Sequence, residues 1–176
     1  SESVERRYSG RAMRPSGAMM APFVFLGPEY DDELRAFYTN TSSKNIFSRL
    51  SILPQLLGGE SLLDSGPLQA MIAQVVDADF LNNVAKAHKS SRRLYIGTVD
   101  PDAQRLVVWN MGLIASSGRP QALGLFRQIL LASSSIPVAF PPVLFKVEAD
   151  GRKYDELHVD GAVKATVFYS ARVFDF

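Results

Sequence analysis

The sequence contains no cysteine. This absence excludes disulfide frameworks, thiol nucleophiles and thiolate metal sites together, and it is compatible with any redox compartment. Histidine is also scarce, because only His88 and His158 occur, far apart in the chain. Two distant histidines without a carboxylate cluster do not predict a zinc site, and we expect no bound metal.

An excess of charge of one sign is lacking as well. The 19 basic and 18 acidic residues leave a net charge of +1. A chain with this balance has no strong field that would gather phosphate backbones at long range. We therefore expect no nucleic-acid partner.

Long apolar runs are missing too. The longest uncharged stretch, residues 128–145, is interrupted by Pro137, Pro141 and Pro142, whereas a transmembrane helix needs about 20 mostly apolar residues. Residues 1–14 are rich in arginine and glutamate and lack the apolar core of a signal peptide. The sequence predicts no transmembrane segment and carries no export signal, which leaves the cytoplasm as the default compartment.

What is present suffices for a globular domain. The chain has 176 residues, of which 47% are hydrophobic, and this length corresponds to about one domain. A chain of this size buries about 70% of its unfolded surface, enough for a sizeable core. Because no repeat or linker divides the sequence, we expect a single domain over residues 1–176.

Helical and strand patterns alternate along this domain, which favours an α/β fold with a mixed, largely parallel sheet. The almost wholly apolar residues 17–27 suit a helix buried on all sides or a core strand, and we interpret them as a buried helix interrupted near Pro22. An acidic first turn predicts a helix from 31 to an end within 40–43. Spacings of three and four predict helices over 68–89 and 123–133. Runs of β-branched and aromatic residues predict strands over residues 93–99 and 105–109, joined by a turn, and a hairpin over 143–147 and 154–159.

One candidate for chemistry is an acidic residue at a strand end, Asp160, followed by Gly161. A carboxylate at the end of a buried strand is partly desolvated, and glycine lets the backbone turn sharply so that the carboxylate can face a cleft. Such a group can act as a general base. The competing interpretation is a simple turn, because Asp-Gly is first of all a turn dipeptide.

Five stretches, read in chain order, resemble the patatin-like phospholipases. They are residues 16–23 (SGAMMAPF), 93–98 (RLYIGT), 108–112 (VWNMG), 130–142 (LLASSSIPVAFPP) and 154–162 (YDELHVDGA). The most specific pieces are ASSSIPVAFPP and the Asp-Gly-Ala turn. The resemblance runs from about residue 16 to residue 168.

The resemblance implies a three-layer α/β/α sandwich with a mixed, largely parallel central sheet, here incomplete at its N-terminus. It also implies a Ser-Asp dyad, in which the serine of a Gly-x-Ser-x-Gly elbow attacks a lipid ester and an aspartate takes its proton. Asp160 matches the aspartate of the family. The substrate would be a lipid or another acyl ester, with peripheral contact to a membrane and without a cofactor.

The elbow departs from the family pattern. Placing Gly17 at its last glycine puts Met13 at the first glycine and Pro15 at the nucleophile, and proline has no hydroxyl. Ser16 becomes the nucleophile only if the frame slips by one residue, which leaves arginine and alanine at the two glycine positions. Otherwise Ser16 is the N-cap of the following helix. The glycine-rich oxyanion loop that the family carries upstream does not precede Ser16.

These observations lead to one expectation with an alternative. By resemblance the chain is a lipid acyl hydrolase of the phospholipase type, inactive as it stands because of Pro15. The alternative is a non-catalytic binding domain or an incomplete fragment. The sequence does not indicate which residues bind substrate, or which head group and acyl length are preferred.

Two further side chains allow two interpretations each, and a third allows one. His158 shares a strand face with Asp160 and either lines the same cleft or is satisfied by local hydrogen bonds. Trp109 either contacts a lipid surface or packs in the sheet. His88, late in the expected helix over 68–89, is expected to be solvated.

Overall fold

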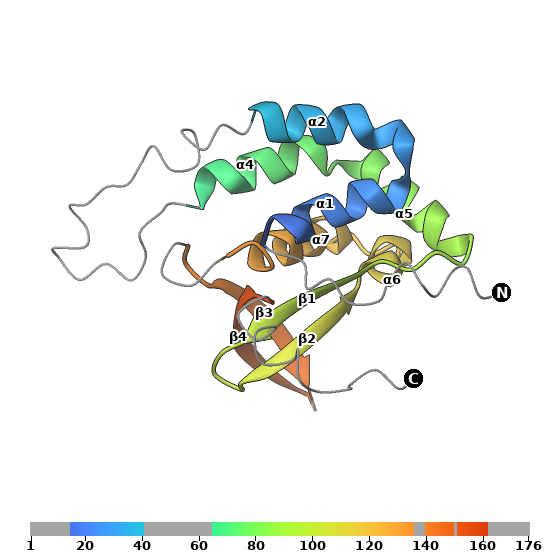
Figure 1. Cartoon of the computed structure of the whole chain (residues 1–176). Helices are drawn as coiled ribbons and strands as arrows, with labels where there is room; N and C mark the ends of the chain where they lie inside the picture. The colour runs from blue at the N-terminus through green and yellow to red at the C-terminus, as the bar shows by residue number, and fades with distance from the viewer. Residues whose placement is uncertain (1–14, 41–64, 136–139, 150, 162–176) are drawn as a thin grey trace, which may run out of the picture.

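The computed structural model describes residues 15–40, 65–135, 140–149 and 151–161, and it gathers the helices on one side of a sheet (Figure 1). The elements in chain order are α1 (Pro15–Leu26), the 3-10 helix η2 (Pro28–Tyr30), α2 (Asp31–Asn40), α4 (Gly66–Val75), α5 (Ala78–Lys89), β1 (Tyr95–Asp100), β2 (Arg105–Asn110), α6 (Met111–Ser116), α7 (Ala122–Ala132), β3 (Val143–Ala149) and β4 (Arg152–Asp160).

The four strands form two hairpins that lie side by side. The strand order is β2-β1-β4-β3, and every neighbouring pair is antiparallel. The first hairpin turns where Asp100 Oδ1 accepts from the backbone N–H groups of Asp102 and Ala103, both at 3.0 Å. The second turns at Gly151, whose φ of 72° favours glycine. Both predicted hairpins are confirmed.

The prediction of a largely parallel sheet within a three-layer sandwich is not confirmed for the described residues. Parallel neighbours need a long crossover connection, whereas short turns can join only antiparallel strands. The sequence here places its strands in consecutive pairs, β1 with β2 and β3 with β4. The coarser expectation, a mixed α/β fold, holds.

One face of the sheet packs against the helices. Register pairs place Ile96 opposite Trp109, Thr98 opposite Asp160, and Phe145 opposite Glu156. Ile96 and Phe145 belong to the hydrophobic core that also contains residues of α7. Because alternate strand residues share a face, Thr98, Trp109, His158 and Asp160 lie on this helix-facing side as well.

Helix α1 is almost wholly buried, as its apolar sequence predicts, but it is not interrupted. It continues through Pro22, which is itself nearly inaccessible to solvent. Proline removes one backbone hydrogen bond from a helix. The burial of Phe23, Phe25 and Leu26 around it offsets that loss. Val24 is the exception, with 63% of its surface exposed.

The helix predicted over residues 68–89 is two helices. Asp77 leaves the helical conformation, and its Oδ1 accepts from the backbone N–H of Phe80 at 2.8 Å, so it caps α5. Arg127 of α7 donates to the carbonyls of Val76 (2.7 Å) and Ala73 (3.1 Å) at the end of α4. The helices α2 and α7 lie where the sequence predicts them, whereas the short α6 was not predicted.

Candidate functional site

Asp160 is the last residue of β4 and is only 3% exposed. Its backbone N–H donates to the carbonyl of Ser135 at 2.9 Å. This bond joins the strand end to the segment that follows α7. Consequently the two most specific stretches of the sequence, the serine-rich stretch after α7 and the Asp-Gly turn, meet in space.

Position 161 requires glycine because the backbone of Gly97 lies very close to it, not because its own backbone angles are unusual. A Cβ atom at this position would lie 2.6 Å from the carbonyl oxygen of Gly97 in β1, and φ of Gly161 lies outside the left-handed region. The Ser133 hydroxyl donates to the same oxygen at 2.8 Å. The sequence suggested a sharp turn as the reason for this glycine. Close packing of β4 on β1 adds a second reason, because it leaves no room for a side chain at this position.

Ser134 and Ser135, which follow Ser133, are both buried. Ser135 Oγ donates to the carbonyl of Leu131 at 2.9 Å. The Ser134 hydroxyl, in a residue that is 8% exposed, has no hydrogen-bond partner within the described part of the chain. A hydroxyl left in this state costs about 1–3 kcal/mol.

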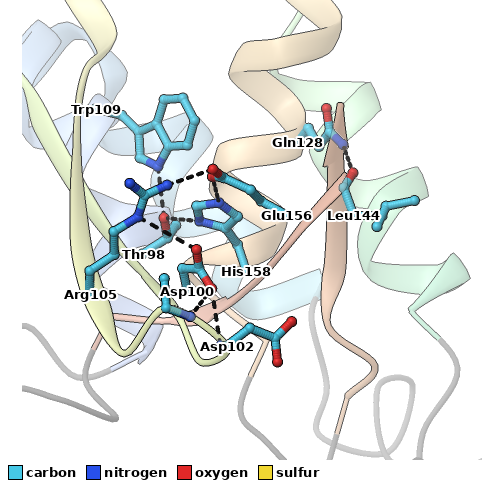
Figure 2. A network of polar contacts seen from close by, with 10 residues as sticks. Thr98, Asp100, Asp102, Arg105, Trp109, Gln128, Leu144, Glu156 and His158 are labelled. Atoms are coloured by element: carbon cyan, nitrogen blue, oxygen red, sulfur yellow. Dashed lines mark hydrogen bonds and ion pairs between the residues drawn. The ribbon is translucent and has the colours of Figure 1, made fainter. Parts of the chain in front are cut away.

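Figure 2 shows a polar network that begins at Thr98, the register partner of Asp160. Trp109 Nε1 donates to Thr98 Oγ1 at 2.7 Å, and Thr98 Oγ1 lies 2.8 Å from His158 Nδ1. His158 Nε2 lies 3.3 Å from Glu156 Oε2. A neutral imidazole with its proton on Nε2, assigned from these partners, satisfies each group in the series.

His158 is enclosed by aromatic rings as well as by polar atoms. It is completely buried, with ring centroids 4.6 Å from Phe145 and 5.6 Å from Trp109. Both ring nitrogens are occupied by Thr98 and Glu156. The local hydrogen-bonding interpretation is confirmed, and a Ser-His-Asp arrangement would need a ring nitrogen that His158 does not have to spare.

The network reaches the surface through an arginine. Arg105 Nη2 lies 2.5 Å from Glu156 Oε1, and its Nε lies 3.5 Å from Asp100 Oδ2. The Arg105 side chain is 54% exposed, so these ion pairs contribute little to stability. Sequence analysis missed this network. The available signal was the alternation of Glu156, His158 and Asp160, which places three titratable groups on one strand face.

The other candidate catalytic residue, Ser16, is the second residue of α1. Because α1 begins at Pro15, Ser16 is not the N-cap that the sequence suggested. Proline is favoured in the first turn of a helix, where its missing N–H costs nothing. The side chain of Ser16 and all of Met13 lie outside the part of the chain that is described.

The remaining interpretations from the sequence divide into one error and one confirmation. His88 is not solvated but half-buried, with its ring against Gly112, and its Nδ1 has no hydrogen-bond partner among the described residues. Trp109 packs in the sheet and stacks on Phe145 at 5.2 Å. Met19, Phe23 and Phe25 of α1 are buried in the hydrophobic core.

Two negative findings apply to residues 15–40, 65–135, 140–149 and 151–161. Within them, no three histidine or acidic side chains come together as a metal site would require. No helix there has the length and apolar composition needed to cross a bilayer.

Comparison with known proteins agrees with this geometry. The sequence model of the patatin-like phospholipases matches residues 16–171. That span includes α1 except Pro15, both hairpins, the serine-rich stretch and Asp160. A search of curated proteins finds no match. Because the family match covers most of the chain, the protein belongs to the patatin-like phospholipase family.

Proposed function

We propose that the domain is a lipid acyl hydrolase domain that retains the general base, Asp160, but lacks a working nucleophile. One observation carries the proposal. Asp160 is a buried carboxylic residue at a strand end, tied by its backbone to Ser135 and followed by a glycine packed on Gly97. A general base must be held in one position relative to its partner, and this packing supplies that rigidity.

The chemistry assigned to Asp160 is transfer of one proton. In a Ser-Asp dyad the serine hydroxyl gives its proton to the carboxylate while its oxygen bonds to the carbonyl carbon of the ester, and the alcohol leaves with that proton. Water then attacks the acyl-enzyme and gives one proton to the carboxylate. The serine oxygen leaves the acyl carbon and takes that proton back, so a fatty acid is released and the dyad is restored. Asp160 can accept a proton in both steps, but it cannot replace the serine.

The nucleophile position is where we propose that activity fails. In the family frame this position holds Pro15, which has neither a hydroxyl nor an N–H. This departure favours the second candidate function, a non-catalytic domain that binds acyl lipids. Among residues 13–17, which the family frame places on the elbow, only Ser16 has a hydroxyl. Ser16 can act as the nucleophile only if the frame slips by one residue.

The direct test measures hydrolysis of a phosphatidylcholine and of a short-chain 4-nitrophenyl ester by the full chain, by Ser16→Ala and by Asp160→Asn. We expect all three proteins to give the background rate, because loss of the nucleophile alone removes several orders of magnitude in turnover. Hydrolysis by the unmodified chain that disappears in both variants would instead establish a Ser16–Asp160 dyad.

The base assignment is tested in a chimera. Residues before Ser16 are exchanged for the strand, glycine-rich loop and elbow of an active patatin-like phospholipase, so that a serine replaces Pro15. We expect ester hydrolysis that is lost in Asp160→Asn and kept in Asp155→Asn, a matched change at an exposed residue of the same strand. A folded chimera without activity, or one insensitive to Asp160→Asn, contradicts the assignment.

A further inference from the structure

Helices α4 and α7 leave a groove of about 580 Å³ between them. This volume lies within the range of about 300–1,000 Å³ that is usual for small-molecule sites. The lining residues of α7 follow helical spacing and therefore form one stripe along that helix. The groove is lined by Gly66, Gln69, Ala70, Ile72 and Ala73 of α4, Gly124, Arg127, Gln128 and Leu131 of α7, and Val143 of β3.

The walls of the groove suit an alkyl chain. Small or apolar side chains supply most of the lining, and those with accessible surface include Ala70, Ala73 and Val143. Gly124 widens the groove, because a Cβ atom placed there would meet nothing within 4 Å. An open, apolar channel between two helices provides the contact surface that a single methylene chain needs.

The groove contains one cationic side chain. Arg127 is half-buried and is the only charged residue among those lining the groove. Its guanidinium donates once to Val76 and once to Ala73. A guanidinium has five N–H groups, so three remain without a partner in the described residues. The neighbouring Asp77 caps α5 and forms no ion pair with Arg127 there.

The position of Arg127 is fixed in advance of any ligand. The two carbonyls that it binds belong to the last turn and the C-cap of α4, where carbonyls lack partners within the helix. Gln128, the next residue, donates to the carbonyl of Leu144 and ties α7 to β3 (Figure 2). A guanidinium held by backbone bonds loses little further freedom when it binds an anion.

The groove is also connected to the Asp160 region. Leu131 lines the groove, and its carbonyl accepts from Ser135 Oγ at 2.9 Å. The Ser135 carbonyl in turn accepts from the backbone N–H of Asp160. Val143, at the same end, is the register partner of His158. The groove therefore ends close to the strand end that carries Asp160.

We propose that this groove binds a fatty acid, with its carboxylate on Arg127 and its alkyl chain along Ala70, Ala73 and Val143. One unpaired cation balances a carboxylate, which carries one negative charge, better than a phosphate monoester, which carries nearly two. The carboxylate also matches the planar fork of a guanidinium. Binding at this groove does not depend on hydrolysis at Asp160, so the site works equally in an active and an inactive chain.

The first test uses calorimetric titration of the full chain with decanoate below its micellar concentration. We expect saturable binding at one site. Decyltrimethylammonium, with the same chain and the opposite charge, should bind at least about tenfold more weakly, and acetate should not bind measurably. Equal binding of the two decyl compounds contradicts the role of Arg127, and absence of decanoate binding contradicts the site. Decyl phosphate binding more tightly than decanoate would reassign the head group.

The second test uses two variants that act on different parts of the ligand. Arg127→Gln keeps hydrogen-bond donors but removes the charge, and should weaken decanoate binding about tenfold or more, the usual effect of losing a charge-assisted bond. Gly124→Leu fills the open space of the groove and should weaken binding similarly while leaving the α4 carbonyls bonded to Arg127.

Two controls separate the loss of the groove's charge from a general loss of charge and from a loss of folding. Arg119→Gln removes the same charge at an exposed position outside the groove and should change decanoate affinity less than twofold. Thermal unfolding of each variant shows whether it is folded. Should Arg127→Gln fail to fold, Gly124→Leu alone decides. Unchanged decanoate affinity in folded Gly124→Leu overturns the proposal.

Discussion

The carbonyl oxygen of Gly97 is enclosed by two residues that come from different parts of the chain. Ser133 donates a hydrogen bond to it, and Gly161 approaches it so closely that a methyl group has no space. Both atoms in that approach belong to the backbone or would be fixed to it, so neither can move aside alone. A small change at Gly161 should therefore be costly.

We predict that Gly161→Ala lowers the free energy of unfolding by about 1–3 kcal/mol, because the new Cβ forces β4 away from β1. Urea unfolding followed by circular dichroism measures this change. Gly124→Ala is the matched control. It introduces the same methyl group into open space within a helix and should raise the free energy of unfolding by about 0.5–1 kcal/mol. Equal effects of both variants would show that the close approach is not real.

The Thr98 hydroxyl links two ring nitrogens, Trp109 Nε1 and the buried His158 Nδ1. Thr98→Val keeps the shape but leaves Trp109 Nε1 and His158 Nδ1 without their partner. We predict a loss of about 1–3 kcal/mol in the free energy of unfolding. Thr98→Ser, which keeps the hydroxyl and loses one methyl group, should cost about 0.8 kcal/mol. A valine variant as stable as the unmodified protein would contradict the network.

At the scale of elements, the division between α4 and α5 shows how two helices can look like one. The apolar positions of both helices face the same core, with Ile72 and Val84 each nearly inaccessible. Their spacing therefore continues across the break. Only the cap at Asp77 marks the boundary, and an aspartate within an amphipathic pattern is easily taken for a surface residue.

Removing that cap should destabilise the protein measurably. We predict that Asp77→Ala lowers the free energy of unfolding by about 1 kcal/mol, because the backbone N–H of Phe80 loses its acceptor. Asp79→Ala is the control, since Asp79 lies in the first turn of α5 but does not cap it. Its effect should stay near 0.5 kcal/mol, the size of a helix-dipole contribution. Reversed magnitudes would place the start of α5 elsewhere.

The predictable elements were those with local signals. The acidic first turn of α2, the helical spacing of α7 and the glycine turn at Gly151 each depend on residues close together in the sequence. The antiparallel order of the sheet was not predictable in this way. It is decided by which strand β1 takes as its second neighbour, and that neighbour, β4, lies about sixty positions later.

At the scale of the whole molecule, the sequence predicted the position of Asp160 but not the contacts between distant parts of the chain. The strand-end position of Asp160 followed from a stretch of seven residues and from the family resemblance. The contact between Thr98 and His158 spans the sheet, and the α4–α7 groove requires two helices from different parts of the chain. Side-chain contacts of this kind depend on register and packing, which composition and spacing do not contain.

The central claim is that this member of the patatin-like phospholipase family keeps its base and lacks its nucleophile. An active-site-directed fluorophosphonate tests it most directly, because the probe bonds covalently only to an activated serine. Mass spectrometry of the treated full chain identifies any labelled residue. We predict that no serine is labelled above the level of the heat-unfolded protein. Labelling of Ser16 that is lost in Ser16→Ala, and reduced in Asp160→Asn, would contradict the claim and establish a working dyad.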